Sequence, residues 1–243
     1  MPAMPRRVRV EINSGEAVTA IVYAAAPKSD MGVSLLLAHG AGASQTSVFM
    51  VRFAEELAAR GIETITFNFL YMEAGRGIPD RADKLEACYR RLIDAFHAGL
   101  LTKHANQKQL MIGGKSMGGR IASQVAAIDA SGISGIVMLG YPLHPPGRPD
   151  KLRSKHLPLI TVPMLFVQGA RDTFGTPPEL QPILQDLKAS AQLYVVEGGD
   201  HSFKVPKRGA PPQDEVYKTV LDEIAVWTRR TIGEKTRRPA IHP

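Results

Sequence analysis

The apolar residues of this chain follow two alternating patterns. Segments rich in apolar residues, which predict strands of a covered sheet, occupy residues 33–38, 62–67, 110–112, 135–139, 163–168 and 191–196. Between them, apolar residues recur at spacings of three and four, which predicts helices within residues 49–57, 85–96, 117–128, 178–188 and 217–227. Strict alternation over residues 7–12, followed by a second run over residues 18–23, indicates an antiparallel pair of strands.

This order of elements predicts an α/β fold. We expect a mostly parallel sheet with an antiparallel N-terminal edge and helices on both faces. No repeat or domain boundary interrupts the pattern, so we expect one domain over residues 1–243, folded from about residue 7 to residue 230. The connection at residues 143–161 is proline-rich and short for a cap domain, which predicts an open or thinly covered site with a minimal lid.

One stretch combines a strand, a sharp turn and a helix around a serine. Gly114-Lys115-Ser116-Met117-Gly118 follows an apolar run and directly precedes a helical pattern. Glycines at both ends of this G-x-S-x-G motif let strand and helix approach, and they leave the hydroxyl exposed at the carboxyl edge of the sheet. Ser116 is therefore a candidate nucleophile, although an ordinary turn serine would fit the same pattern.

Two nucleotide-binding interpretations of the glycines fail on spacing. A phosphate-binding loop needs a glycine five positions before Lys115, where the chain has Leu110. A dinucleotide fingerprint that begins at Gly40 and Gly42 needs a third glycine where the chain has Gln45.

Two later strand ends supply partners for the serine. Asp172 follows the strand at residues 163–168, and His201 follows the last strand. Because the carboxyl ends of parallel strands meet at one edge, Ser116, Asp172 and His201 are expected to form a catalytic triad. His201 would take the serine proton, and Asp172 would hold the imidazole. Asp200 is expected to shape the loop, and the rival acid Glu197 lies too near His201 in the same loop.

Composition and charge indicate which broad class of protein this is. Apolar residues make up 44% and charged residues 22% of the chain, as in ordinary globular proteins. The net charge of +7 is accounted for by three arginines before residue 10 and by the basic residues from Arg229 on. We therefore expect two flexible basic ends rather than a nucleic-acid-binding face, although binding through those ends is an alternative.

The sequence lacks the features that are typical of secreted, membrane-spanning and metal-binding proteins. Cys88 is the single cysteine and lies on the apolar side of a predicted helix, so a buried, inert thiol and no disulfide are expected. No secretory signal or membrane span is visible, which favours a cytoplasmic protein. Metal-binding motifs are absent, and no cofactor is predicted.

Five segments together resemble the small α/β-hydrolases, over about residues 7–230. They are His39-Gly40-Ala41-Gly42, Asn68-Phe69 with Tyr71-Met72-Glu73, Gly113 to Arg120, Gly169 to Asp172, and Gly199 to Phe203. The chain is similar to the dienelactone-hydrolase-like members and looks closest to the branch of testis-expressed and NSL-complex-subunit-type proteins. Dienelactone hydrolases use a cysteine nucleophile, so Ser116 departs from them and their particular substrate does not carry over. The resemblance implies an oxyanion hole built from the backbone amides of Ala41 and Met117, each contributing roughly 3–4 kcal/mol.

Together these features predict a serine hydrolase that cleaves a small carboxylic ester or thioester through an acyl-serine intermediate. The alternative is a hydrolase-fold binding or scaffolding protein with little catalytic activity. Lys115 is either a solvated neighbour of the serine or a cation facing the substrate. Arg76 and Arg81 are surface charges or hold an anionic substrate, and Tyr141, at a strand end, is a further candidate for substrate binding. His39 is expected to be structural, and the sequence does not indicate an oligomeric state.

Overall fold

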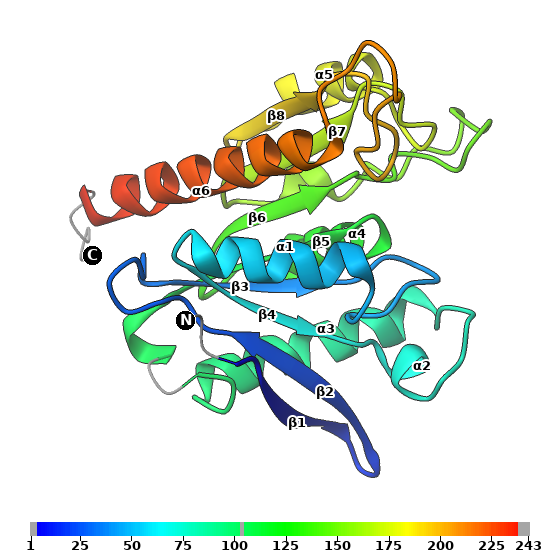
Figure 1. Ribbon diagram of the computed structural model, residues 1–243. Coiled ribbons are helices and arrows are strands. Elements are labelled where there is room, and N and C mark those ends of the chain that lie inside the picture. Colours follow the sequence, from blue (N-terminus) through cyan, green and yellow to red (C-terminus); the bar gives the residue numbers. More distant parts are fainter. Residues whose placement is uncertain (1–3, 103–104, 238–243) are drawn as a thin grey trace.

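A computed structural model describes residues 4–102 and 105–237, and its centre is a twisted sheet of eight strands (Figure 1). The strands are β1 (Arg6–Asn13), β2 (Glu16–Tyr23), β3 (Val33–Ala38), β4 (Ile62–Phe67), β5 (Gln109–Lys115), β6 (Ile133–Leu139), β7 (Met164–Gly169) and β8 (Ala191–Val196). Their order across the sheet is β1-β2-β4-β3-β5-β6-β7-β8. β2 pairs antiparallel with both β1 and β4, and the remaining pairs are parallel. The predicted fold class is confirmed.

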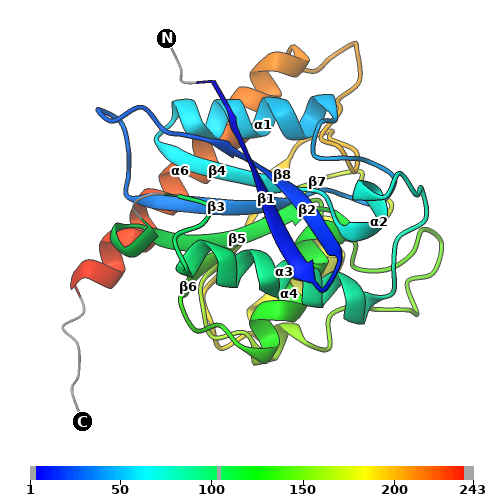
Figure 2. The same cartoon turned by 90° about the horizontal axis from the view of Figure 1, so that it is seen from below.

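Helices cover both faces of this sheet, as Figure 2 shows along its edge. α1 (Val48–Ala59) and α6 (Gln213–Arg237) pack on one face, with Phe53, Leu57, Ile224 and Trp227 in a shared apolar core. α3 (Ala82–His97), α4 (Met117–Ile128) and α5 (Pro177–Gln185) pack on the other. The short α2 (Leu70–Glu73) lies between two predicted elements, where the sequence pattern predicts no helix. Two single-turn 3-10 helices are η1 (Ala105–Gln107) and η2 (Leu157–Leu159).

The order of the strands places a crevice between β3 and β5. From β3 the chain continues to β4 on one side, and it then crosses to β5 on the other side of β3. In open α/β sheets, loops diverge where the winding reverses in this way, and ligands bind at the carboxyl ends of those strands. The loop after β3 and the turn after β5 therefore meet at this position.

The connection from β6 to β7 carries no cap domain. Over residues 140–163 its regular structure is limited to η2, and this part of the chain is fully described.

Cys88 is buried on α3, and burial raises the pKa of its thiol to about 12, so the thiol stays protonated as expected. Within the described ranges, no helix has both the length and the apolar composition that crossing a bilayer requires.

The prediction that the basic excess resides in flexible ends is wrong for most of its residues. Arg6, Arg7 and Arg9 belong to β1, where the adjacent Val8 and Val10 face the core and the backbone pairs with β2. Arg229 and Arg230 belong to α6, and Arg230 donates a hydrogen bond to Gln192 on β8. The expected flexibility of residues 1–3 and 238–243 lies outside the described residues.

Candidate active site

Ser116 occupies a strained turn between β5 and α4. Its φ of 51° and ψ of −116° lie in a region that side-chain-bearing residues rarely adopt. The backbone N–H of Ser116 donates to Leu139 O at 2.9 Å, which ties the turn to β6. A Cβ on Gly114 would lie 2.5 Å from the carbonyl carbon of Gly118, and one on Gly118 would lie 2.4 Å from Ala38 O. Glycine is therefore required at both positions because backbone contacts backbone there.

Three side chains that are distant in sequence form one chain of hydrogen bonds. Ser116 Oγ lies 2.8 Å from His201 Nε2, and His201 Nδ1 lies 2.7 Å from Asp172 Oδ2. Asp172 is fully buried, whereas the side chain of His201 is 21% exposed. Because the carboxylate can only accept, Nδ1 carries the proton and Nε2 is free to accept the serine proton. The structure thus brings together the three residues that the sequence predicts as a triad.

The carboxylate of Asp172 is held by donors that the sequence analysis missed. Gln168 Nε2 donates to Asp172 Oδ2 at 2.8 Å, and the Phe174 N–H donates to Oδ1 at 2.8 Å. Gln168 Oε1 accepts from the Tyr141 N–H at 2.8 Å, which sets the orientation of the amide and leaves Nε2 to donate. The available signal was a polar residue near the end of the otherwise apolar β7.

The loop carrying His201 is shaped by its neighbours. Asp200 Oδ1 accepts from the N–H groups of Ser202 (2.7 Å) and Lys204 (2.9 Å), so Asp200 builds the turn, as predicted. The ring of Phe174 lies against the imidazole, with the ring centres 4.3 Å apart. Both contacts restrict the ring of His201 to a position between Ser116 and Asp172.

His39 fixes the loop after β3. The Phe69 N–H donates to His39 Nε2 at 3.1 Å, so Nδ1 must carry the proton, and it donates to Gly40 O at 2.8 Å. Burial lowers the pKa of His39, which keeps the ring neutral. The carbonyl and the N–H of one trans peptide point in opposite directions, so this contact turns the Ala41 N–H away from His39. The role of His39 is structural, as expected.

The Met117 N–H is the second predicted oxyanion donor. Met117 is the first residue of α4, and the first N–H groups of a helix have no acceptor within it. Ala41, Ser116 and Met117 line the same cavity. Two backbone donors are therefore available beside the serine hydroxyl.

That cavity has a volume of about 580 Å³ and lies over the carboxyl ends of β3 and β5. Apolar side chains, including Phe49, Leu85 and Phe174, supply much of its wall. Among the titratable lining residues besides His201 are Asp80, Lys115, Arg120 and Arg153. Its size suits a small molecule.

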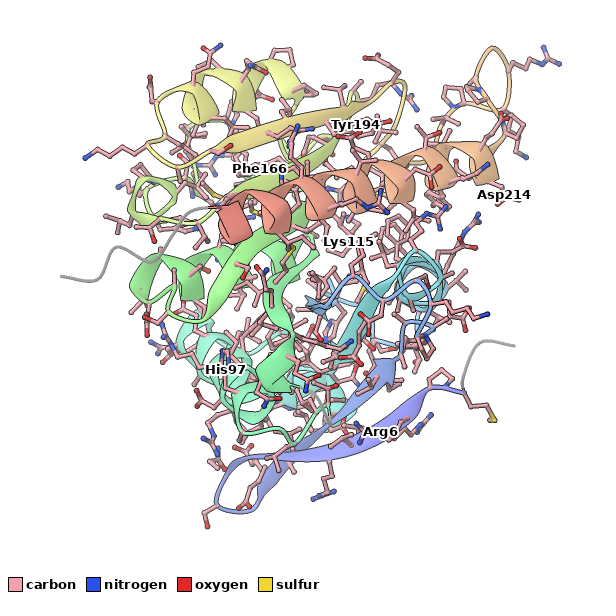
Figure 3. The ribbon with its side chains drawn as sticks, turned by 90° about the vertical axis from the view of Figure 1, so that its left-hand side faces the viewer. Arg6, His97, Lys115, Phe166, Tyr194 and Asp214 are labelled. Carbon is pink, nitrogen blue, oxygen red and sulfur yellow. The ribbon has the colours of Figure 1, made fainter. Side chains whose placement is uncertain are left out.

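Lys115 lies in the interior of the molecule (Figure 3) and directly precedes Ser116 in the chain. Its side chain lines the cavity, and its Nζ donates to the backbone oxygen of His201 at 2.7 Å. Burial lowers the pKa of Lys115 to about 8, against the opposing influence of Asp172 and Asp200. The solvated alternative is wrong, because the residue is only 8% exposed. Lys115 links the end of β5 to the loop that carries the imidazole.

The other candidates for substrate binding lie outside the cavity wall. Arg76 pairs with Asp80 at 2.9 Å, and Arg81 is exposed and lies 3.5 Å from Asp83. Tyr141 is fully buried, and its hydroxyl donates to Arg153 O at 2.7 Å. Within the described residues, no three His, Cys, Asp or Glu side chains are grouped so that they could hold a metal ion.

Lys115→Met is expected to leave the protein at least as stable at pH 7 but to lower kcat about tenfold, because the loop of His201 loses an anchor. The drop in the pKa of Lys115 from 10.5 to about 8 corresponds to about 3 kcal/mol of unfavourable burial at neutral pH. The lost hydrogen bond is worth about 1.5–3 kcal/mol, so the two terms nearly cancel. Thermal unfolding and kcat for 4-nitrophenyl acetate test this, with the exposed Lys218→Met as control.

The stability difference between Lys115→Met and the wild type should depend on pH. Between about pH 8 and pH 10.5 the unfolded chain binds a proton that the folded chain does not, so the wild type gains stability as pH rises. Methionine does not titrate, so the variant's relative stability should fall across this window. A large loss of stability at pH 7 with unchanged kcat would contradict the positioning role.

Solved structures share this fold over more than nine tenths of the chain. The dienelactone hydrolase of Anabaena variabilis ATCC 29413 superposes with a TM-score of 0.67 at 20% identity, over 96% of this chain and 99% of its own. XC6422 of Xanthomonas campestris, described as a serine hydrolase without a lid, gives 0.71 at 19% identity over 93% and 96%. Est1E of Butyrivibrio proteoclasticus gives 0.71 at 12% identity over 93% and 99%.

A family model identifies the family, and two sequence relatives match most of the chain. Two proteins of Mycobacterium tuberculosis (strains CDC 1551 / Oshkosh and ATCC 25618 / H37Rv), provisionally named phosphoribosyl transferases, are 31% identical over 183 residues. That match covers 74% of this chain but only 38% of their length. The family model described as "Alpha/beta hydrolase domain" matches residues 31–229. The chain therefore belongs to the alpha/beta hydrolase domain family.

Proposed function

We propose that this protein is a serine hydrolase that cleaves a small carboxylic ester or thioester through an acyl-Ser116 intermediate. The observation that carries the proposal is the continuous chain of hydrogen bonds from Ser116 Oγ through His201 to Asp172, at the wall of the cavity. A serine hydroxyl is a poor nucleophile at neutral pH, and an adjacent imidazole held by a buried carboxylate is the arrangement that activates it.

The proposed reaction has two balanced stages. Ser116 Oγ attacks the carbonyl carbon while its proton moves to His201 Nε2, and the imidazolium then returns that proton to the departing oxygen or sulfur as the carbon–heteroatom bond breaks. Water, deprotonated by His201, next attacks the acyl-serine, which releases the acid and restores the hydroxyl. Asp172 accepts the Nδ1–H bond throughout and stabilises the charged ring. The amides of Ala41 and Met117 would face the oxyanion of each tetrahedral intermediate.

The form of the cavity favours small substrates. The β6–β7 connection adds no cap domain over the cavity, so an acyl group enters without the opening of a lid. The apolar wall, with Phe49 and Leu85, suits a short carbon chain. The finer resemblance to testis-expressed and NSL-complex-subunit-type proteins, and a cytoplasmic location, stay predictions that this proposal does not need.

Activity-based labelling tests the proposal directly. A fluorophosphonate reacts with a serine only where that serine is activated, so we expect stoichiometric labelling that mass spectrometry assigns to Ser116. Hydrolysis of 4-nitrophenyl acetate should be lost in step with labelling. An unlabelled, inactive protein that captures a stable partner would instead support the scaffolding alternative.

A further inference from the structure

Two arginines line the cavity and are paired with no carboxylate in the part of the chain that the structure describes. Arg120 lies one helical turn after Ser116 on α4, and its backbone N–H donates to the backbone oxygen of Ser116 at 3.1 Å. Arg153 lies on the β6–β7 connection. Among the described residues, neither forms an ion pair within 4.0 Å, whereas Asp80, an acidic residue of the same wall, pairs with Arg76. The wall beside the serine therefore carries two guanidinium groups that no carboxylate of the described residues contacts.

Arg120 is incompletely satisfied in this position. Its Nη1 donates to Gln124 Oε1 at 3.0 Å, but its Nε is buried without a hydrogen-bond partner among the described residues. Burial lowers the pKa of Arg120, and the nearby charge of Arg153 lowers it further, while Tyr141 and Glu86 oppose this shift. Guanidinium nevertheless stays charged in proteins. A buried donor and two like charges are costly unless an anion completes the site.

Arg153 is held in place through its backbone. Its N–H donates to Leu143 O at 2.7 Å, and its carbonyl accepts from the buried hydroxyl of Tyr141 at 2.7 Å. The side chain adds a long contact of 3.5 Å from Nη1 to Pro142 O. The backbone that carries the guanidinium is thus fixed, which reduces the conformational entropy lost when a ligand binds. The guanidinium itself keeps N–H donors for that ligand.

We propose that Arg120 and Arg153 form an anion subsite, so that the ester cleaved at Ser116 carries a carboxylate or similar anionic group near its scissile bond. This inference rests on the proposed function and adds a substrate class to it. Guanidinium groups with free N–H donors bind planar oxyanions through charge-assisted hydrogen bonds. It differs from the anion site that the sequence suggested, because Arg76 and Arg81 do not line the cavity.

Paired charged and neutral esters test the subsite. On the acyl side, kcat/KM for mono-4-nitrophenyl adipate is compared with that for 4-nitrophenyl hexanoate. On the alcohol side, 3-acetoxybenzoate is compared with phenyl acetate. In the wild type we expect the anionic member of at least one pair to be favoured about tenfold or more. Arg153→Gln and Arg120→Gln should each reduce that ratio about tenfold, the effect of a charged hydrogen bond.

Controls separate this effect from general electrostatics and from misfolding. Arg91→Gln changes the same charge on α3, outside the cavity, and should leave the ratio unaltered. If Arg120→Gln does not fold, Arg153→Gln and the wild-type ratio decide the matter. Fluorophosphonate labelling of Ser116 with ratios near one in both pairs would overturn the subsite but leave the hydrolase intact. Absent labelling and turnover would overturn the hydrolase itself.

Discussion

Replacing Ser116 with alanine is expected to lower kcat/KM for 4-nitrophenyl acetate by about 10⁴-fold or more and to abolish fluorophosphonate labelling. The variant has no nucleophile, although His201, Asp172 and the backbone donors of Ala41 and Met117 keep their positions. Any residual rate would come from binding and from the oxyanion donors. The fold should tolerate the change, because alanine lacks only the hydroxyl.

Ser131→Ala supplies a matched control for this experiment. Ser131 lies in an exposed turn before β6, so its removal should change neither labelling nor hydrolysis. Circular dichroism and thermal unfolding show whether each variant is folded. Equal hydrolysis by the wild type and the Ser116→Ala variant would remove Ser116 from the mechanism.

Asp172→Asn is expected to lower kcat by about 10⁴-fold while leaving the protein folded. Asp172 Oδ1 accepts from the Phe174 N–H, so the asparagine oxygen stays there and its NH₂ replaces Oδ2. That NH₂ would face two donors, His201 Nδ1 and Gln168 Nε2. His201 relieves this conflict by moving its proton to Nε2, and Nε2 can then no longer accept the serine proton.

The neighbouring acid offers the control for that substitution. Asp200 directly precedes His201, but its Oδ1 accepts backbone N–H bonds that an asparagine oxygen preserves. Asp200→Asn should therefore change kcat less than tenfold. If the two variants lost activity equally, the assignment of Asp172 as the partner of the imidazole would be contradicted.

The secondary-structure elements and the strand ends could be predicted from the sequence because they depend on residues that are close together in the chain. β3, β4 and β8 have the bounds that the sequence predicts for three strands, and the glycines on both sides of Ser116 indicate the turn. Motif order then placed Asp172 and His201 at the same edge. α2 escaped notice because four residues contain too little periodicity to separate a helical turn from a loop.

Hydrogen-bond partners that meet only in the folded structure could not be predicted in this way. Lys115 contacts the backbone of His201, and the amide of Gln168 is oriented by the N–H of Tyr141, and both contacts join positions that no motif spacing relates. Arg153 is likewise held through the hydroxyl of Tyr141. Lys115 looked solvated because lysine usually is, yet α1 and the loop of His201 enclose it. The basic ends were misjudged for a related reason: strand pairing at β1 and packing of α6 order residues whose charge alone suggests disorder.

The glycines of the turn also determine where mutations can accumulate. A Cβ on Gly113 would lie 2.1 Å from Val137 O, and one on Gly118 would lie 2.4 Å from Ala38 O, so a larger residue would have to displace β6 or β3. Arg153, by contrast, stands on a connection with little regular structure. Evolution or directed selection can therefore alter the substrate-facing rim while the turn tolerates almost no change. Variants with new substrate preferences should be sought in residues 142–153 rather than around Ser116.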